Sequence, residues 1–157
     1  MKKIIAIVAG VLLASMASAD DDPQQAIPAR LKVMFERPDK PLDIAPIVVQ
    51  ADWAIVGWRQ DGRGGRALMK KTHCGWSIYL CSGDSLKDTG TLEAIGLSAH
   101  DAAGLAAKLK DAEAGLDSSS LALFSSFEGT VTMMNEASNG AGHAGHEDHE
   151  GHEGHAQ

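Results

Sequence analysis

Four short segments with the alternating pattern of β-strands follow one another in the middle of the chain, and only a few residues connect them. They comprise residues 44–50, 53–59, 66–71 and 76–81. Connections this short can join only antiparallel neighbours, because a parallel pair needs a crossover of about a dozen residues or more. The middle of the chain therefore predicts a four-stranded antiparallel meander.

The alternation within these segments predicts which side chains share a face of the sheet. In segment 53–59 it places Trp53 and Trp58 on opposite faces. In segment 76–81 it predicts one face with Trp76, Ile78 and Leu80, and an opposite face with Ser77, Tyr79 and Cys81. The three tryptophans therefore cannot all lie on one face, and at least one must line a groove or pack beneath a helix.

A helix is predicted before the first strand. Residues 20–25 have the composition of a frayed terminus, and Pro28 suits the first turn of a helix. Apolar residues then recur at helical spacing, at Ile27, Leu31, Met34 and Phe35. The proline-containing segment 37–41 ends this helix, because proline cannot continue it.

Helical patterns also follow the last strand. Residues 85–97 predict a short helix broken by Gly90 and Gly96. Ser98 is a favourable N-cap for a second helix, and Asp117 caps a third, whose core side chains are Leu121, Phe124 and Phe127. The order of elements predicts an α+β domain with helices packed on one face of an antiparallel sheet.

The first 19 residues have the pattern of a cleavable secretory signal. Lys2 and Lys3 precede an apolar run over residues 4–14, and the small residues 17–19 provide a cleavage site. A membrane-spanning helix needs roughly 20 apolar residues, which is more than this run supplies. We therefore predict cleavage after Ala19, a periplasmic location, and no membrane insertion after cleavage.

The remaining chain divides into one α+β domain over residues 20–136 and a tail over residues 137–157. The length before the tail is enough for one hydrophobic core but not for two. The chain carries 21 acidic and 14 basic side chains, a net charge of −7. An acidic protein repels nucleic acid and gains nothing from anionic lipid, so nucleic-acid and membrane-surface roles are excluded.

The tail carries the strongest chemical pattern, a histidine at every third position, at His143, His146, His149, His152 and His155. Neutral imidazole is a common ligand for copper, zinc and nickel ions, and the acidic residues in between can add oxygen ligands. The tail lacks large apolar residues, so we expect it to be disordered without a ligand and to wrap several imidazoles around one ion. The alternative is a solubilising or pH-responsive tail.

Sulfur ligands form a second set of metal candidates. The thioethers of Met133 and Met134 favour Cu(I), although two methionines after an amphipathic helix can equally pack against it. Cys81 ends a predicted strand, where its thiol can pack as a small apolar group.

Cys74 lies beside His73 at a predicted hairpin tip, where both side chains would be exposed. A disulfide between Cys74 and Cys81 would require a sharp bend, because an extended strand separates the two residues too far. Gly75 leaves such a bend open.

No catalytic set stands out in the sequence. The glycine-rich residues 62–66 precede a strand and lack the lysine and helix of a phosphate-binding loop, so a hairpin turn explains them better. No serine lies in a nucleophile elbow, and no carboxylate pair follows from spacing. We therefore expect a protein without enzymatic activity.

Five segments together resemble a known family: residues 35–42 (FERPDKPL), 52–58 (DWAIVGW), 64–68 (GGRAL), 76–84 (WSIYLCSGD) and 121–129 (LALFSSFEG). In these segments the chain resembles the bacterial periplasmic copper uptake system-associated proteins, and the resemblance covers roughly residues 26–134. None of the segments is a catalytic motif. The resemblance implies copper handling, with a periplasmic copper chaperone or an envelope copper-uptake component as partner, and it implies Cys81, in its Leu-Cys-Ser-Gly-Asp setting, as a candidate ligand.

These observations predict a periplasmic accessory protein that binds or buffers copper and assists its uptake or delivery, without catalysis. The alternative belongs to another class: a small domain whose concave face binds a peptide or an organic ligand, with an incidental histidine-rich tail. Tryptophan fluorescence distinguishes the two, because it would respond to an organic ligand but not to metal in the second case.

Overall fold

The structure is a computed structural model and describes residues 22–133. Its helices are α1 (Pro23–Phe35), the 3-10 helix η2 (Asp84–Lys87), α2 (Thr89–Ile95), α3 (Ala99–Glu113) and α4 (Ser118–Ser125). Its strands are β1 (Asp43–Gln50), β2 (Trp53–Gln60), β3 (Arg63–Thr72), β4 (Gly75–Ser82) and β5 (Thr130–Thr132). The predicted signal segment and the histidine-rich tail lie outside the described residues.

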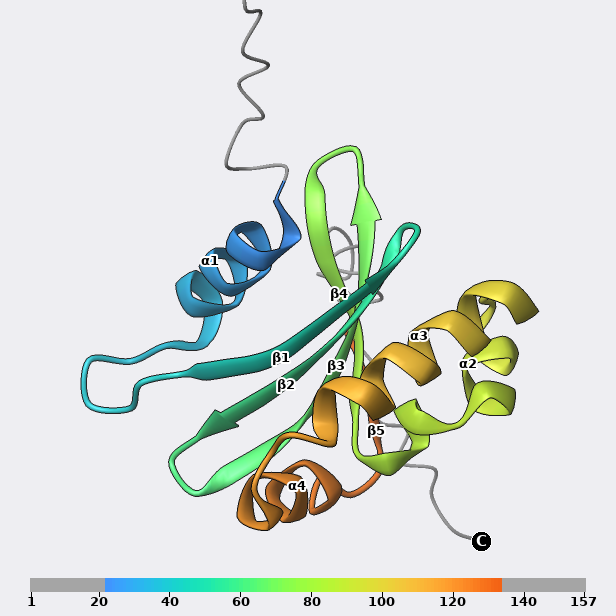
Figure 1. Cartoon of the computed structure of the whole chain (residues 1–157). Helices are drawn as coiled ribbons and strands as arrows, with labels where there is room; N and C mark the ends of the chain where they lie inside the picture. Colours follow the sequence, from blue (N-terminus) through green and yellow to red (C-terminus); the bar gives the residue numbers. More distant parts are fainter. Residues whose placement is uncertain (1–21, 134–157) are drawn as a thin grey trace, which may run out of the picture.

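The strands form one antiparallel sheet in the order β1-β2-β3-β4-β5 (Figure 1). The α+β class and the antiparallel meander are therefore confirmed, but the predicted count of four strands was wrong. The fifth strand is only three residues long and pairs with the end of β4. A segment this short shows no alternating pattern. It forms a strand because it pairs with the free edge of β4.

The helices cover both faces of the sheet, whereas the sequence analysis expected one covered face. We call the face under η2, α2, α3 and α4 the α3 face, and the opposite face, which α1 covers, the α1 face (Figure 1). The helix α1 was predicted correctly as an element. Sequence periodicity does not reveal on which side of a sheet a helix packs.

The helix α1 begins at Pro23, earlier than Pro28, so residues 23–25 are helical and not frayed as expected, whereas residues 20 and 21 lie outside the described residues. The side chain of Asp22 caps the helix by accepting a hydrogen bond from the Gln24 backbone N–H, at 3.0 Å. Pro23 occupies the first helical position, where its missing N–H costs nothing. Pro28 therefore lies inside the helix, five residues after its first residue.

The segment over residues 85–97 also differs from its prediction. It divides into η2 and α2, and Asp88 caps α2 through a 2.7 Å hydrogen bond from the Thr91 N–H. Gly90 lies within α2 and does not break it. Gly96 ends α2 with a φ of 113°, a left-handed conformation that favours glycine.

A β-bulge in β4 changes the faces predicted for that strand. Leu68 of β3 pairs with Leu80, whereas the next residue, Met69, pairs with Ile78, so Tyr79 is the extra residue. Trp76 and Ile78 therefore pack in the core of the α1 face, and Leu80 packs in the core of the α3 face. The expectation that these three share a face was wrong because the bulge reverses the alternation. The separation of the three tryptophans onto two faces is confirmed.

The strand β3 starts at Arg63, three residues earlier than predicted, so only Asp61 and Gly62 form the turn before it. Gly64 and Gly65, which were predicted in the turn, lie within the strand instead. A Cβ at position 64 would lie 2.9 Å from the Leu123 Cβ, and a Cβ at position 65 would lie 3.0 Å from the Phe127 ring. These positions are glycines because the segment from α4 to β5 packs directly on the backbone of β3.

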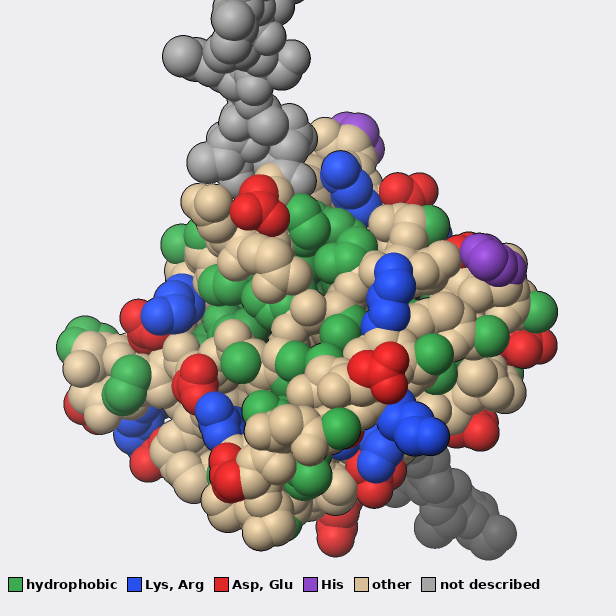
Figure 2. Space-filling model, viewed as in Figure 1, with side chains coloured by type: hydrophobic (Ala, Val, Ile, Leu, Met, Phe, Trp, Pro, Cys, Tyr) green, Lys and Arg blue, Asp and Glu red, His purple; other side chains and the backbone are tan. Residues whose placement is uncertain are grey.

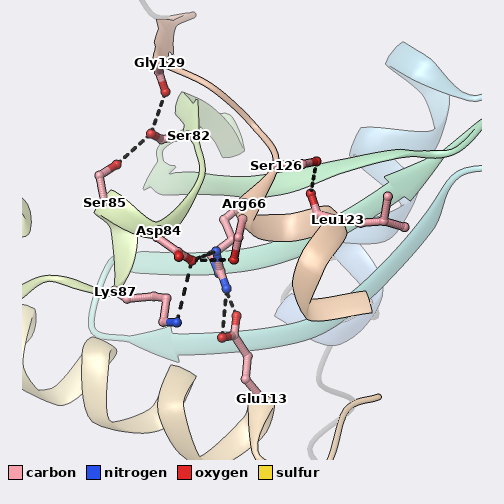
Figure 3. Close-up of polar contacts among 10 residues, drawn as sticks. Arg66, Ser82, Asp84, Ser85, Lys87, Glu113, Leu123, Ser126 and Gly129 are labelled. Carbon is pink, nitrogen blue, oxygen red and sulfur yellow. Dashed lines mark hydrogen bonds and ion pairs between the residues drawn. The ribbon is translucent and has the colours of Figure 1, made fainter. Parts of the chain in front are cut away.

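The α3 face is closed around a buried arginine (Figure 3). The side chain of Arg66 is fully buried, and its guanidinium donates two hydrogen bonds to the Glu113 carboxylate, at 2.6 and 2.9 Å. It also donates to Asp84 at 3.0 Å and lies 5.4 Å from the centre of the Phe124 ring. Strand β3, the end of α3 and the start of η2 are thereby fixed to one another by charge-assisted hydrogen bonds.

Candidate functional site

The structure separates the predicted ligands into a described and an undescribed group. The five tail histidines and Met134 lie outside the described residues, and Cys81 and Met133 lie inside them. The described histidines lie at the β3–β4 turn and in α3, and Figure 2 shows histidine side chains in two separate surface places. Within residues 22–133, no three His, Cys, Asp or Glu side chains gather to hold a metal ion.

Cys81 and Met133 lie on neighbouring segments of the chain. Cys81 of β4 pairs with Val131 of β5, and two residues further the Met133 N–H donates a hydrogen bond to the Tyr79 carbonyl at 3.1 Å. Residues two apart on a strand point to the same face, so Val131 and Met133 both follow Cys81 onto the α1 face. The short strand β5 thus brings together two sulfur side chains that are 52 positions apart in the sequence.

Both sulfur side chains line an apolar cavity of about 230 Å³ on the α1 face. Its wall runs from α1 across the sheet to β5 and consists of Leu31, Phe35, Leu42, Trp58, Gln60, Ala67, Ile78, Cys81, Phe127, Val131 and Met133. Figure 2 shows hydrophobic side chains gathered beside α1. Along α1, Ile27 and Leu31 are buried, whereas Phe35 in the last turn is 38% exposed and lines the cavity together with Leu31.

Burial controls the chemistry of the Cys81 thiol. Desolvation in this apolar wall raises the pKa of Cys81 from 9.0 to about 11. The group is therefore a neutral thiol at physiological pH and a poor nucleophile. A soft metal ion would have to displace the proton, so its affinity for this thiol would increase with pH.

Two polar groups interrupt the apolar wall. The Gln60 amide nitrogen donates to the Phe35 and Lys40 carbonyls, at 3.0 and 2.9 Å, which fixes the orientation of the amide. The indole nitrogen of Trp58 is buried and has no hydrogen-bond partner among residues 22–133. Trp58 also meets the Phe127 ring edge to face, with ring centres 5.8 Å apart.

Sequence reasoning missed most of this site. Phe127 was expected in the last helix, but α4 ends at Ser125 and Phe127 reaches the α1 face beyond it. The alternating pattern of β2 could identify Trp58 as a residue of this face, because its side chain points away from the face of Trp53. The position of Gln60, two residues after Trp58 on the same strand, was an available signal that was not used.

The other soft-ligand candidates are not part of this site. Cys74 is exposed beside His73 in the turn between β3 and β4, as predicted, and its backbone N–H donates to the Thr72 hydroxyl at 3.2 Å. Both cysteines are free thiols, so the bend that would bridge Cys74 and Cys81 does not form.

Within residues 22–133, no helix combines the length and the hydropathy that a membrane-crossing segment needs. Comparisons with protein-family models, with curated proteins and with solved structures find no match to this chain. The function must therefore be argued from the site itself.

Proposed function

We propose that this protein is a periplasmic, non-enzymatic accessory protein that binds copper and assists its uptake or delivery. The observation that supports the proposal is that the Cys81 and Met133 side chains line the same cavity. Thiolate and thioether are the soft ligands that Cu(I) prefers. The resemblance of residues 26–134 to copper uptake system-associated proteins favours the same ion.

In this proposal the two ligand groups have different tasks. The tail histidines, His143 to His155, capture Cu²⁺ reversibly, and zinc or nickel ions can occupy the same imidazoles. Cys81 and Met133, with Met134 as a third candidate, take Cu(I) at the cavity on the α1 face. Binding there replaces the Cys81 proton by the metal ion, so one proton is released for each ion bound. The partner would be a periplasmic copper chaperone or an envelope uptake component.

A Cu(I) titration against a competing chelator, under reducing conditions, tests the sulfur site. The chain without residues 137–157 should bind one Cu(I), and Cys81→Ser should abolish this binding. Met133→Leu should weaken it, because leucine keeps the volume and lacks the thioether. The matched control is Cys74→Ser, which should leave the binding unchanged. Equal Cu(I) binding by the chain with and without Cys81→Ser would contradict the sulfur site.

A separate experiment tests the tail. Deletion of residues 139–157 should remove most of the Cu²⁺ and Zn²⁺ bound by the full chain, as measured by equilibrium dialysis. An unchanged stoichiometry after the deletion would exclude the tail as the capture site, without affecting the sulfur site.

A further inference from the structure

The cavity on the α1 face is larger than a metal site needs. Its volume is about 230 Å³, far more than one bound ion would occupy. An engineered apolar cavity of about 150 Å³ holds benzene, and sites for drug-sized ligands usually measure about 300–1,000 Å³. The space therefore fits an organic molecule of one aromatic ring with a short substituent.

The cavity borders the protein surface, and its wall carries no charge. Phe35 is 38% exposed and Val131 is 49% exposed, and both line the cavity, so a ligand can enter from solvent without unfolding the sheet. None of the 11 described residues that line it is charged at neutral pH. A carboxylate or an ammonium group would lose its hydration here without a compensating partner. Charge complementarity therefore points to a neutral molecule.

The two polar side chains of the wall offer no free donor to a ligand. The indole nitrogen of Trp58 has almost no accessible surface, so its N–H does not open into the cavity. The amide nitrogen of Gln60 already donates to the Phe35 and Lys40 carbonyls, which occupies both of its hydrogens. A carbonyl oxygen that entered the cavity would give up its hydrogen bonds with water and find no strong donor on these side chains. The wall therefore selects against polar atoms as well as against charge.

We infer that the cavity is a binding site for a small, neutral hydrocarbon, of the size and class of an alkylbenzene. Burial of apolar surface supplies the affinity, and the lack of free donors supplies the selectivity. Because Cys81 lines the cavity, the bound hydrocarbon shields its thiol. The inference concerns the metal-free cavity and does not depend on copper binding.

Two probes of nearly equal shape test the inference on the full chain, with a chelator present to keep the protein free of metal. They are α-methylstyrene and acetophenone, which differ by a methylene group in place of a carbonyl oxygen. In a chemical-shift titration followed by NMR, α-methylstyrene should bind saturably, with a dissociation constant on the order of 0.1–1 mM. Acetophenone should bind roughly tenfold more weakly, because its oxygen loses its hydrogen bonds with water.

A matched pair of substitutions locates the site. Ala67→Leu should abolish the binding of α-methylstyrene, because Ala67 lies in the cavity wall and leucine would fill the space. Ala102→Leu is the same change at a buried position of the α3 face and should leave the affinity unchanged. Circular dichroism confirms that each variant is folded.

The two thiols provide a second measurement on the unaltered chain. Addition of α-methylstyrene should slow the alkylation of Cys81 in proportion to the occupied fraction of the cavity. The exposed Cys74 is the internal control, and its alkylation rate should not change. Mass spectrometry after a timed reaction at alkaline pH gives both rates.

Absence of saturable binding by the folded wild-type chain would overturn the inference. So would binding that survives Ala67→Leu in a folded variant, or an unchanged alkylation rate of Cys81 at saturation. Equal affinity of the wild-type chain for both probes would overturn the selection against polar atoms. Because no metal is present, none of these outcomes bears on the copper proposal.

Discussion

The two faces of the sheet are built from similar aliphatic side chains but to different completeness. The α3 face is sealed by three α-helices, and its only fully buried charge, Arg66, is paired with Glu113 and Asp84 among the described residues. The α1 face is covered by one helix, and it retains a cavity and two indole N–H groups without a partner in the described chain. One face therefore supplies stability, which allows the other to remain incompletely packed.

The two faces differ first in how completely their buried polar groups are hydrogen-bonded. On the α3 face the guanidinium of Arg66 has two carboxylate partners and the ring of Phe124, so its burial is compensated. On the α1 face the N–H groups of Trp58 and Trp76 are buried without partners among residues 22–133. Buried donors without a partner cost stability, so the polar groups of the α1 face are less completely satisfied than those of the α3 face.

Loss of the buried charge of Arg66 should have the largest effect on the stability of the fold. Arg66→Ala leaves the Glu113 carboxylate buried without its partner and should lower the free energy of unfolding by about 3–5 kcal/mol, as measured by urea denaturation. The control is Arg63→Ala at the exposed start of β3, for which a change within about 0.5 kcal/mol is expected. Similar losses in both variants would show that the sealed face does not depend on this ion pair.

The burial of Cys81 should appear as slow alkylation. With a pKa of about 11, its thiolate fraction at pH 8 is about a hundredfold below that of an ordinary thiol, and iodoacetamide should modify it correspondingly slowly. Mass spectrometry after a timed reaction distinguishes it from the exposed Cys74. Equally fast labelling of both residues would mean that the cavity wall is open to water.

The same pKa shift has a consequence for stability. Because the folded pKa is raised, the neutral thiol contributes stability below about pH 9, and this contribution is lost as the pH rises from 9 toward 11. The unfolding free energy should therefore fall less steeply over this range in Cys81→Ala than in the wild-type chain. Parallel curves for the two proteins would contradict the burial of the thiol.

A matched pair of alanines compares the packing of the two faces directly. Ala102 of α3 and Ala67 of β3 are both buried, but only Ala67 borders the cavity. Ala102→Leu should overpack the α3 face and cost about 1–3 kcal/mol, whereas Ala67→Leu should change stability by less than about 1 kcal/mol. Thermal unfolding of both variants measures the difference, and a reversed order would mean that the α3 face is the looser one.

The smallest effect is expected at the helix caps. Ser98 accepts a hydrogen bond from the Asp101 N–H at 3.1 Å, and Ser98→Ala should cost about 1 kcal/mol of global stability. The equivalent change in α1, Asp22→Ala, should instead raise hydrogen exchange within α1 with a smaller global loss. A larger global loss for Asp22→Ala would show that α1 is the more tightly coupled helix.

Local patterns predicted the elements of this fold well. The alternation of residues 53–59 and the caps Ser98 and Asp117 act over a few positions, and the structure contains the corresponding strand and helices. The errors arose where a distant segment decides. Residues 61–65 were interpreted as a turn because of their glycines, but Gly64 and Gly65 lie in β3 and pack against Leu123 and Phe127.

The candidate site was only half predictable for the same reason. Cys81 and Met133 were each identified by their chemistry, but nothing in the sequence places them in one wall. That placement depends on β5 joining β4 and on the bulge at Tyr79, both of which are products of pairing between strands.

The sequence by itself determined the residue types, the α+β class, the acidic charge and the spacing of the tail histidines. Only the tertiary structure decided that α1 covers the opposite face, that Arg66 is buried with Glu113, and that a cavity remains beside Cys81. The two kinds of feature differ in how far apart in the sequence the interacting residues lie. Propensity, alternation and capping act between neighbours in the chain, whereas burial, ion pairing and cavities arise from contacts between segments far apart in sequence.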